Sequence, residues 1–199
     1  ASEAFLELRK WLDKERKNWP FGYSYEFGGE AESSQKANRS ISEKLPIAIF
    51  IIILLLVAQF NSIRKSAIVL STIPLGIIGV VFGLLIGQSF FGFMTLLGII
   101  SLAGIVINNA IVLLEKIKTE LEDNPENLSD AIIQASQKRV RPILLTTATT
   151  VLGLIPLYLG GGEMWEPMAL AIIGGLLFST ILTLGVVPVL YALLYKVKA

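Results

Sequence analysis

Five long apolar runs occupy most of the chain after its first 44 residues. They lie near 45–60, 67–87, 90–114, 142–159 and 167–195. A helix needs roughly 20 apolar residues to cross the hydrocarbon layer of a bilayer, and lipid offers the backbone no hydrogen bonds, which favours helices. The pattern therefore predicts an all-α membrane bundle of five transmembrane helices. The last run exceeds one crossing, so its helix is expected to tilt or to extend beyond the bilayer.

The amino-terminal region, residues 1–44, has a different character, because it contains 8 basic and 8 acidic residues. Apolar residues recur at helical spacing in Phe5–Leu12. Aromatic and polar residues then alternate in Tyr23–Phe27, as they do in a half-buried strand. We expect a short α+β remnant outside the membrane at 1–28, followed by a connecting helix at 29–44.

A polar segment separates the third apolar run from the fourth. A helix is expected within it near 125–138, because Leu128, Ala131, Ile132 and Ala135 share one face. Lys and Arg gather in this segment, after the first run and at the carboxyl end, whereas the loops after the second and fourth runs contain none. Short cytoplasmic loops retain Lys and Arg. The helix near 125–138 is therefore expected in the cytoplasm, with the amino end of the chain outside and the carboxyl end inside.

The composition supports a membrane protein and argues against an enzyme. Hydrophobic residues make up 53% of the chain and charged residues 17%, with a mean hydropathy of +0.67. There is no Cys and no His, which excludes disulfides, Cys or His zinc sites and Ser-His catalysis. We expect no cofactor and no resident metal. The net charge is only +1 and the basic residues form no single patch, so no nucleic-acid partner is expected.

Polar residues inside the third apolar run form one stripe. Ser101, Gly104, Asn108 and Glu115 fall at offsets of 3, 7 and 14 from the first, and Asn109 lies beside them. Amide side chains in hydrocarbon need partners and usually face the protein interior. Two readings follow: the amides bond a neighbouring helix, or they belong to an ion or proton pathway.

A second stripe lies in the fourth run, where Arg139, Thr146 and Gly153 are spaced by seven residues. Arg139 and Arg141 also fit a positive anchor at the membrane surface. Thr146 and its neighbouring threonines also fit hydrogen bonding to their own helix. If the two stripes face each other, a functional site is favoured over these alternatives.

None of the five apolar runs carries a carboxylate in its middle. A proton-driven carrier needs a protonatable group within the membrane, usually Asp or Glu. If this chain takes part in proton-coupled transport, the acids come from elsewhere.

Several segments, in this order, resemble multidrug efflux pumps of the resistance-nodulation-cell division (RND) superfamily. The resemblance extends from about Tyr23 to the carboxyl end. The segments that carry it are Phe27–Glu32, Ala58–Ser62, Ile73–Gly76, Gly104–Leu113 and Arg139–Thr147.

The resemblance implies the carboxyl-terminal part of a twelve-span chain, its eighth to twelfth spans, with 1–28 as the end of a periplasmic porter domain. Members of the hydrophobe/amphiphile efflux class are homotrimers of the bacterial inner membrane. They exchange protons for drugs or other amphiphiles by alternating access, and they pass the cargo to a periplasmic adaptor and an outer-membrane channel. The absent amino-terminal part would carry the proton-binding Asp pair.

The resemblance also assigns residues to a proton relay. Arg139 and Thr146 would face the Asp pair, and Asn108 stands where the best-studied pumps carry a lysine. Ser101, Gly104, Asn109 and Arg141 would form the supporting polar or small face.

Other functions remain open. Heavy-metal exporters of the superfamily are less favoured, because the run Asn108–Ile111 resembles the drug-exporting branch and no run holds a Met or acidic ligand cluster. A lipid-exporting or secretion-assisting relative uses the same bundle. A non-transporting sensing or assembly module is the alternative from a different class.

Overall fold

The computed structural model describes residues 2–20, 22–23, 30–123 and 127–195. The chain divides into two compact units, residues 1–45 and 46–199. The first contains helix α1 (Ser2–Glu15), a 3₁₀ turn (Arg16–Asn18) and the beginning of helix α2 (Glu30–Phe60). Only helices and turns occur in its described part. The predicted strand at Tyr23–Phe27 lies outside the described residues except for Tyr23.

The second unit is a bundle of long apolar helices. It comprises the rest of α2 together with α3 (Ile63–Ile86), α4 (Phe93–Asp123), α5 (Leu128–Gly160) and α6 (Gly162–Leu194). These five helices are long and apolar enough to cross a membrane. The prediction of an all-α bundle with five spans is confirmed, and the chain is a multi-pass membrane protein.

Three helices continue well beyond the apolar runs, and one of them is α4, whose run ends at 114 and which continues to Asp123. The expected connecting helix and the first span are one continuous helix, α2. The expected helix near 125–138 and the fourth span are likewise one helix, α5, with Pro142 inside it. The polar segments contain good helix formers such as Lys, Arg and Gln, and a proline removes only one backbone donor. Hydropathy marks where a helix enters lipid, and here the helices continue beyond that point.

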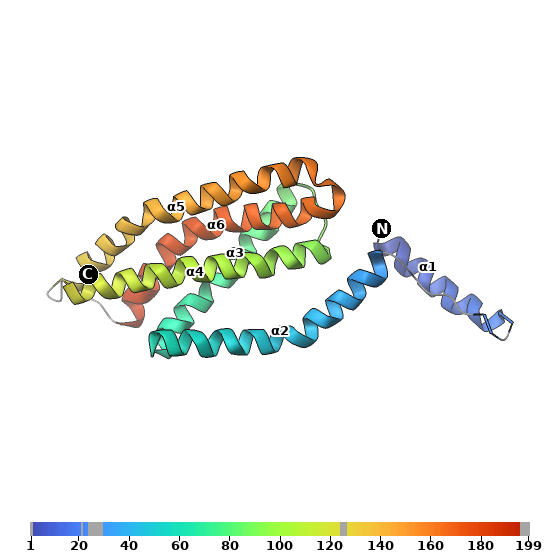
Figure 1. The fold of residues 1–199 in the computed structure, drawn as a ribbon, viewed down its shortest axis with the longest axis horizontal. Helices are drawn as coiled ribbons and strands as arrows, with labels where there is room; N and C mark the ends of the chain where they lie inside the picture. The colour runs from blue at the N-terminus through green and yellow to red at the C-terminus, as the bar shows by residue number, and fades with distance from the viewer. Residues whose placement is uncertain (1, 21, 24–29, 124–126, 196–199) are drawn as a thin grey trace. The chain divides into compact units, whose positions relative to one another are not determined.

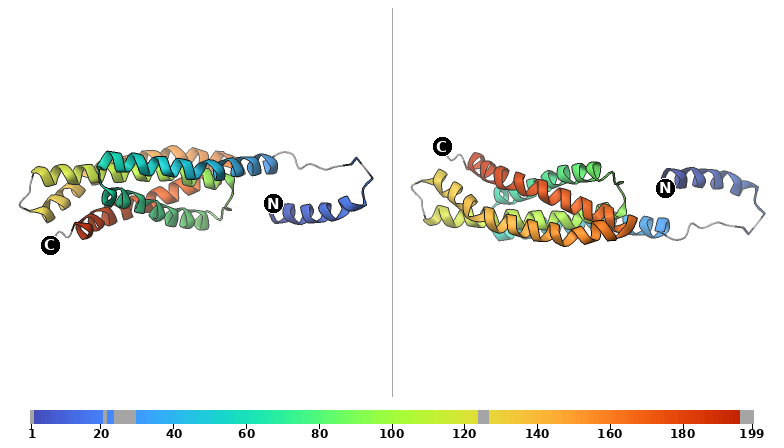
Figure 2. Two further views of the ribbon diagram at one scale, coloured as in Figure 1. Left: turned by 90° about the horizontal axis from the view of Figure 1, so that it is seen from below. Right: turned by 90° about the horizontal axis from the view of Figure 1, so that it is seen from above.

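Helix α6 organises the bundle, because it packs against α3, α4 and α5 (Figures 1 and 2). Its contact with α3 depends on glycine. A Cβ added at Gly174 would lie 2.7 Å from the Cα of Gly83 and 2.8 Å from the backbone oxygen of Gly79. Only glycine leaves room for backbones at this separation, as in other membrane helix pairs with small residues.

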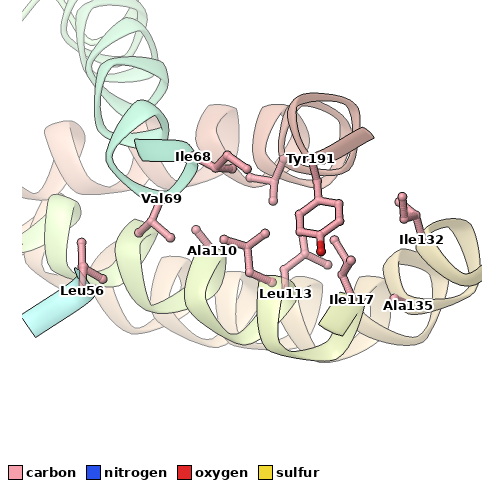
Figure 3. Packing of buried hydrophobic residues seen from close by; sticks show 11 residues of the cluster. Leu56, Ile68, Val69, Ala110, Leu113, Ile117, Ile132, Ala135 and Tyr191 are labelled. Carbon is pink, nitrogen blue, oxygen red and sulfur yellow. The ribbon is translucent and has the colours of Figure 1, made fainter. Parts of the chain in front are cut away.

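A buried apolar cluster fixes the positions of α4 and α5 at one end of the bundle. Figure 3 shows it in close-up: Leu113 and Ile117 of α4 lie beside Tyr191 of α6, and Ala135 of α5 lies on the far side of Ile117. Ile132 also belongs to this cluster, which we call the lower cluster. The polar segment between the third and fourth runs therefore contributes core residues, because its apolar face packs on α4 and α6.

We expect the substitution Gly174→Ala to destabilise the bundle by about 1–3 kcal/mol, because the added methyl meets backbone atoms that cannot rotate away. Gly185→Ala is the matched control on the same helix, since a Cβ there meets nothing within 4 Å. The measurement is the thermal unfolding midpoint of the purified protein in detergent. Equal midpoints for the two variants would contradict the close packing of α3 on α6.

Candidate functional site

One side of α4 is open, and it carries the predicted polar stripe. Ser101, Gly104 and Asn108 are exposed, and a Cβ added at Gly104 would meet nothing within 4 Å. Val106 and Ala110 are fully buried in the bundle. Helix α4 is therefore amphipathic, with apolar residues in the core of this chain and part of its polar side facing away from that core.

The threonines of α5 divide between two sides of the helix. The hydroxyl of Thr147 is buried and lies 2.8 Å from that of Thr180 on α6, where it joins the two helices. Thr146 and Thr149 are exposed, and Gly153 has open space in front of it. In the sequence, Thr146 and Thr147 differ only in the side of the helix on which each falls. The structure shows that Thr147 lies in the contact between α5 and α6.

The exposed threonines bond to their own helix. Thr146 donates to the backbone oxygen of Ile143 at 2.9 Å, and Thr150 donates to that of Thr146 at 2.8 Å. A hydroxyl has one hydrogen and two lone pairs. In this arrangement the hydroxyl oxygen of Thr146 remains available as an acceptor, while its hydrogen is used within the helix.

Arg139 lies on α5 seven residues before Thr146 and is partly buried. Its Nε is fully enclosed and has no hydrogen-bond partner in the described part of the chain. A buried donor without an acceptor is costly, so this Nε is an unsatisfied group on the α5 helix. Arg141, two residues on, is exposed.

The exposed polar and small residues of α4 and α5 together form what we call the open face: Ser101, Gly104, Asn108, Thr146, Thr149 and Gly153. Large apolar side chains are also exposed beside them on α5, at Leu145 and Leu152, whereas the exposed parts of α3 and α6 carry large apolar residues such as Phe82 and Ile181. Large apolar side chains suit lipid, whereas small and polar ones suit contact with another helix. Asn109 is only partly exposed, at the edge of the open face.

Of the predicted relay residues, Asn108 and Thr146 lie on the open face and Arg139 lies at its border. No hydrogen bond joins the side chain of Asn108 to Arg139 or Thr146, all of which lie in the described residues. The two stripes belong to helices that pack together, α4 and α5. The side chains of Asn108 and Thr146 are therefore available to a partner that packs on the open face.

Two polar contacts near the open face were not foreseen from the sequence. Glu120 of α4 is almost fully buried, and its carboxylate lies 2.7 Å from both Lys116 and Lys138. Lys138 precedes Arg139 on α5, so this ion pair joins the two helices beside the arginine. Gln59 of α2 donates a hydrogen bond of 2.8 Å to Glu115 of α4. Sequence spacing could suggest only the pair Lys116–Glu120, which is four residues apart on one helix. The pairs Lys138–Glu120 and Gln59–Glu115 each join two different helices.

Within the described residues, no group of three or more His, Cys, Asp or Glu is placed to hold a metal ion.

Comparison with known proteins identifies the family. The model of the AcrB/AcrD/AcrF family matches residues 8–195. The chain belongs to this family. This membership confirms the resemblance to RND efflux transporters that the sequence motifs indicate.

Among similar proteins is the cobalt-zinc-cadmium resistance protein CzcA of Cupriavidus metallidurans, 33% identical over 89% of this chain and 17% of CzcA. Another is the multidrug resistance protein MdtC of Edwardsiella ictaluri, 35% identical over 87% of this chain and 17% of MdtC. A solved heavy-metal efflux pump matches with a TM-score of 0.76 and 30% identity, over 98% of this chain and 20% of the pump.

The chain thus spans less than a fifth of these two curated relatives. The AcrB/AcrD/AcrF relatives include both metal and multidrug resistance proteins. The expectation that drug exporters are favoured over metal exporters is therefore not confirmed by the comparisons, and it stays a prediction.

We expect Glu120→Ala to lower the thermal unfolding midpoint in detergent, because Lys116 and Lys138 would then lie together without their shared carboxylate. Glu122→Ala is the control. Glu122 lies on the same helix and reaches only Lys118, at 3.8 Å, with both side chains exposed. The midpoint should fall clearly further for Glu120→Ala, and the interpretation of the ion pair is wrong if Glu122→Ala costs as much.

Proposed function

We propose that this chain forms the carboxyl-terminal half of the membrane domain of a proton-coupled efflux transporter. The observation that carries the proposal is the open face of α4 and α5, with the unpaired buried Nε of Arg139 at its border. The absent amino-terminal part of the same protein covers this face and brings an Asp pair to Arg139. Family membership supports the proposal, because the family consists of efflux transporters.

The open face suits a carboxyl group in both of its protonation states. An ionised carboxylate accepts hydrogen bonds, and Arg139 and the amide of Asn108 are donors. A protonated carboxyl group also donates, and the free lone pairs of Thr146 accept. A carboxyl group on this face can therefore exchange one set of partners for the other when it binds a proton, which is what a proton relay requires.

Asn108 gives this relay one charge fewer than a lysine would. A neutral amide forms a hydrogen bond with the carboxylate but no ion pair. In our proposal Arg139 supplies the positive charge, and Asn108 detects the ionised carboxylate through a hydrogen bond. Ser101, Gly104 and Asn109 let the covering helix approach closely.

The proposed setting is the bacterial inner membrane, with the amino end of this chain in the periplasm and the carboxyl end in the cytoplasm. The transporter is a homotrimer that works by alternating access and passes cargo to a periplasmic adaptor and an outer-membrane channel. It is not an enzyme. Cargo binding occurs mainly in the periplasmic domain, outside this chain.

Our first candidate cargo is a drug or other amphiphile. The resemblance of Asn108–Ile111 to drug exporters and the similarity to MdtC support it. Divalent metal cations are the second candidate, favoured by the similarity to CzcA and to a solved heavy-metal pump.

We expect Arg139→Ala in the full-length protein to reduce proton-driven export on the order of 100-fold, because a preorganised charge at the relay is lost. The measurement is uptake of a fluorescent amphiphile, and separately of Co²⁺, into inverted vesicles with an imposed pH gradient. Arg64→Ala, which removes an exposed arginine from the first turn of α3, should leave export unchanged. If transport of the amphiphile or of Co²⁺ depends on Arg139, that compound is a cargo of the transporter. If neither cargo depends on Arg139, the proposed function is wrong.

Asn108→Ala should reduce the same export about tenfold, as expected for loss of a hydrogen bond to a charged group. Asn108→Gln keeps the amide and should retain more activity than the alanine variant. Full export by Asn108→Ala, at normal protein abundance, would remove Asn108 from the relay.

A further inference from the structure

A pocket of about 630 Å³ opens where helix α2 ends, helix α3 begins and helix α6 ends. It is lined by Val57, Asn61, Ser62, Ile63, Arg64 and Tyr195. None of these residues belongs to α4 or α5, whose residues form the open face. Ligand pockets in proteins commonly measure roughly 300–1,000 Å³. The pocket is therefore large enough for a small ligand or for the headgroup of a lipid.

The charge of the pocket is positive. Arg64 is exposed, and among the described residues that line the pocket it is the only charged one. In the part of the chain that the structure describes, no carboxylate forms an ion pair with Arg64. A guanidinium group binds phosphate through two parallel N–H donors. A ligand that carries a phosphate group therefore matches the pocket in charge.

Two hydroxyl groups of the pocket are held in place by the helices that carry them. Ser62 caps α3, where its Oγ accepts a hydrogen bond of 3.5 Å from the backbone N–H of Lys65. The ring of Tyr195 stacks on that of Tyr191, with ring centroids 4.5 Å apart. Tyr191 is itself buried in the lower cluster (Figure 3). The hydroxyl oxygens of Ser62 and Tyr195 lie 3.3 Å apart.

This hydroxyl pair retains one hydrogen for a ligand. The bond between Ser62 and Tyr195 uses one of their two hydroxyl hydrogens, whichever residue donates. No described residue accepts the other hydrogen. The side chain of Asn61 adds an amide, which both donates and accepts. The pocket can therefore bond phosphate oxygens and also hydroxyl groups attached to the phosphate.

The apolar part of the pocket favours a ligand from the bilayer over a soluble anion. Val57 belongs to the last turns of the apolar helix α2, and Ile63 is 77% exposed directly beside Arg64. This combination of an apolar and a cationic side chain suits the boundary between lipid headgroups and acyl chains. Tyrosine is also enriched at that boundary. An inorganic anion would leave Val57 and Ile63 without a role.

The charge of the pocket also discriminates between lipid headgroups. Phosphatidylcholine carries a cation beside its phosphate, and this cation would be repelled by Arg64 and would find no carboxylate among the described lining residues. The glycerol headgroup of phosphatidylglycerol carries hydroxyl groups instead. Hydroxyl groups can bond to the amide of Asn61 and to the hydroxyl pair. An anionic headgroup with hydroxyl groups fits best.

We propose that this pocket binds an anionic phospholipid of the phosphatidylglycerol type. Arg64 binds the phosphate, and Asn61 and the hydroxyl pair bond the headgroup. Val57 and Ile63 contact the beginning of the acyl chains. In the orientation proposed above, this lipid belongs to the cytoplasmic leaflet, where anionic lipids attract basic residues. Binding requires neither the relay nor cargo, because the pocket shares no residue with the open face.

The test uses the purified full-length protein in detergent and a phosphatidylglycerol with a photoreactive diazirine near the top of one acyl chain. Light attaches the bound lipid to nearby side chains, and mass spectrometry of peptides covering 57–64 measures labelling at this pocket. Unlabelled lipids compete for the site. Phosphatidylglycerol should halve the labelling at a concentration about fivefold lower than phosphatidylcholine does, the effect of one basic residue on an anionic lipid. Inorganic phosphate should compete poorly, because it lacks acyl chains.

Two variants assign the binding to named groups. Arg64→Ala should raise the phosphatidylglycerol concentration needed for half-competition about tenfold, because it removes a charged hydrogen-bonding partner. Tyr195→Phe keeps the ring and the charge of the pocket and should raise it about fivefold. Tyr158→Phe removes a hydroxyl from α5 outside the pocket and should change nothing. Export does not pass through this pocket, so Arg64→Ala should alter lipid labelling only.

Equal competition by phosphatidylglycerol and phosphatidylcholine would overturn the proposal, because it would show unselective lipid contact. Competition by inorganic phosphate as strong as that by phosphatidylglycerol would show a site for a soluble anion instead. Unchanged competition in Tyr195→Phe would also overturn the proposal, since attraction to Arg64 alone would then explain the binding. The measurement is made without a pH gradient or cargo, so its result is independent of the proposed transport function.

Discussion

Hydrocarbon cannot form hydrogen bonds, and this constraint governs every polar group in the five spanning helices. The bundle meets it in two ways. Thr146 and Thr150 bond to their own helix, and Thr147 finds Thr180 on the neighbouring one. Among the buried side-chain atoms of the described residues, the Nε of Arg139 and the hydroxyl of Thr183 have no hydrogen-bond partner, and Asn108 is exposed. Asn108 and Arg139 lie on and beside the open face, which we propose is covered by another protein surface.

The same constraint separates a closed side of the bundle from an open one. On the closed side, glycines let α3 and α6 approach to backbone contact, and apolar clusters fill the space around α6. On the open side, small residues leave room and the polar groups remain available. A rigid closed side suits a relay, because it holds Arg139 and Asn108 in position while the carboxyl groups that they serve change charge.

The sequence predicted the five spans because a membrane crossing leaves a strong, local signal of length and apolarity. It could not show that α2 and α5 continue as single helices into polar sequence, since hydropathy changes there while helix propensity does not. Helical spacing placed Asn108, Arg139 and Thr146 on stripes, and family resemblance gave them roles. The strand predicted at Tyr23–Phe27 stays a prediction.

Contacts between helices were the part that spacing did not reveal. Gln59 and Glu115 are 56 residues apart, and Lys138 and Glu120 are 18 apart, so no periodic pattern relates either pair. The separation of Thr147 from Thr146 is a similar case, because the direction of each hydroxyl depends on how α5 is rotated against α6. These are consequences of packing, and they required the three-dimensional structure.

The central claim is that protein, rather than lipid, covers the open face in the complete transporter. The most direct test places a spin label at Asn108, at Thr149 and at Ile181 in separate full-length variants and measures collisions with oxygen, which concentrates in lipid. Ile181 is 72% exposed and apolar, and it serves as the lipid-facing reference. We expect strong collision with oxygen at Ile181 and weak collision at Asn108 and Thr149. Equally strong collision at all three positions would show that the open face meets lipid and would contradict the account.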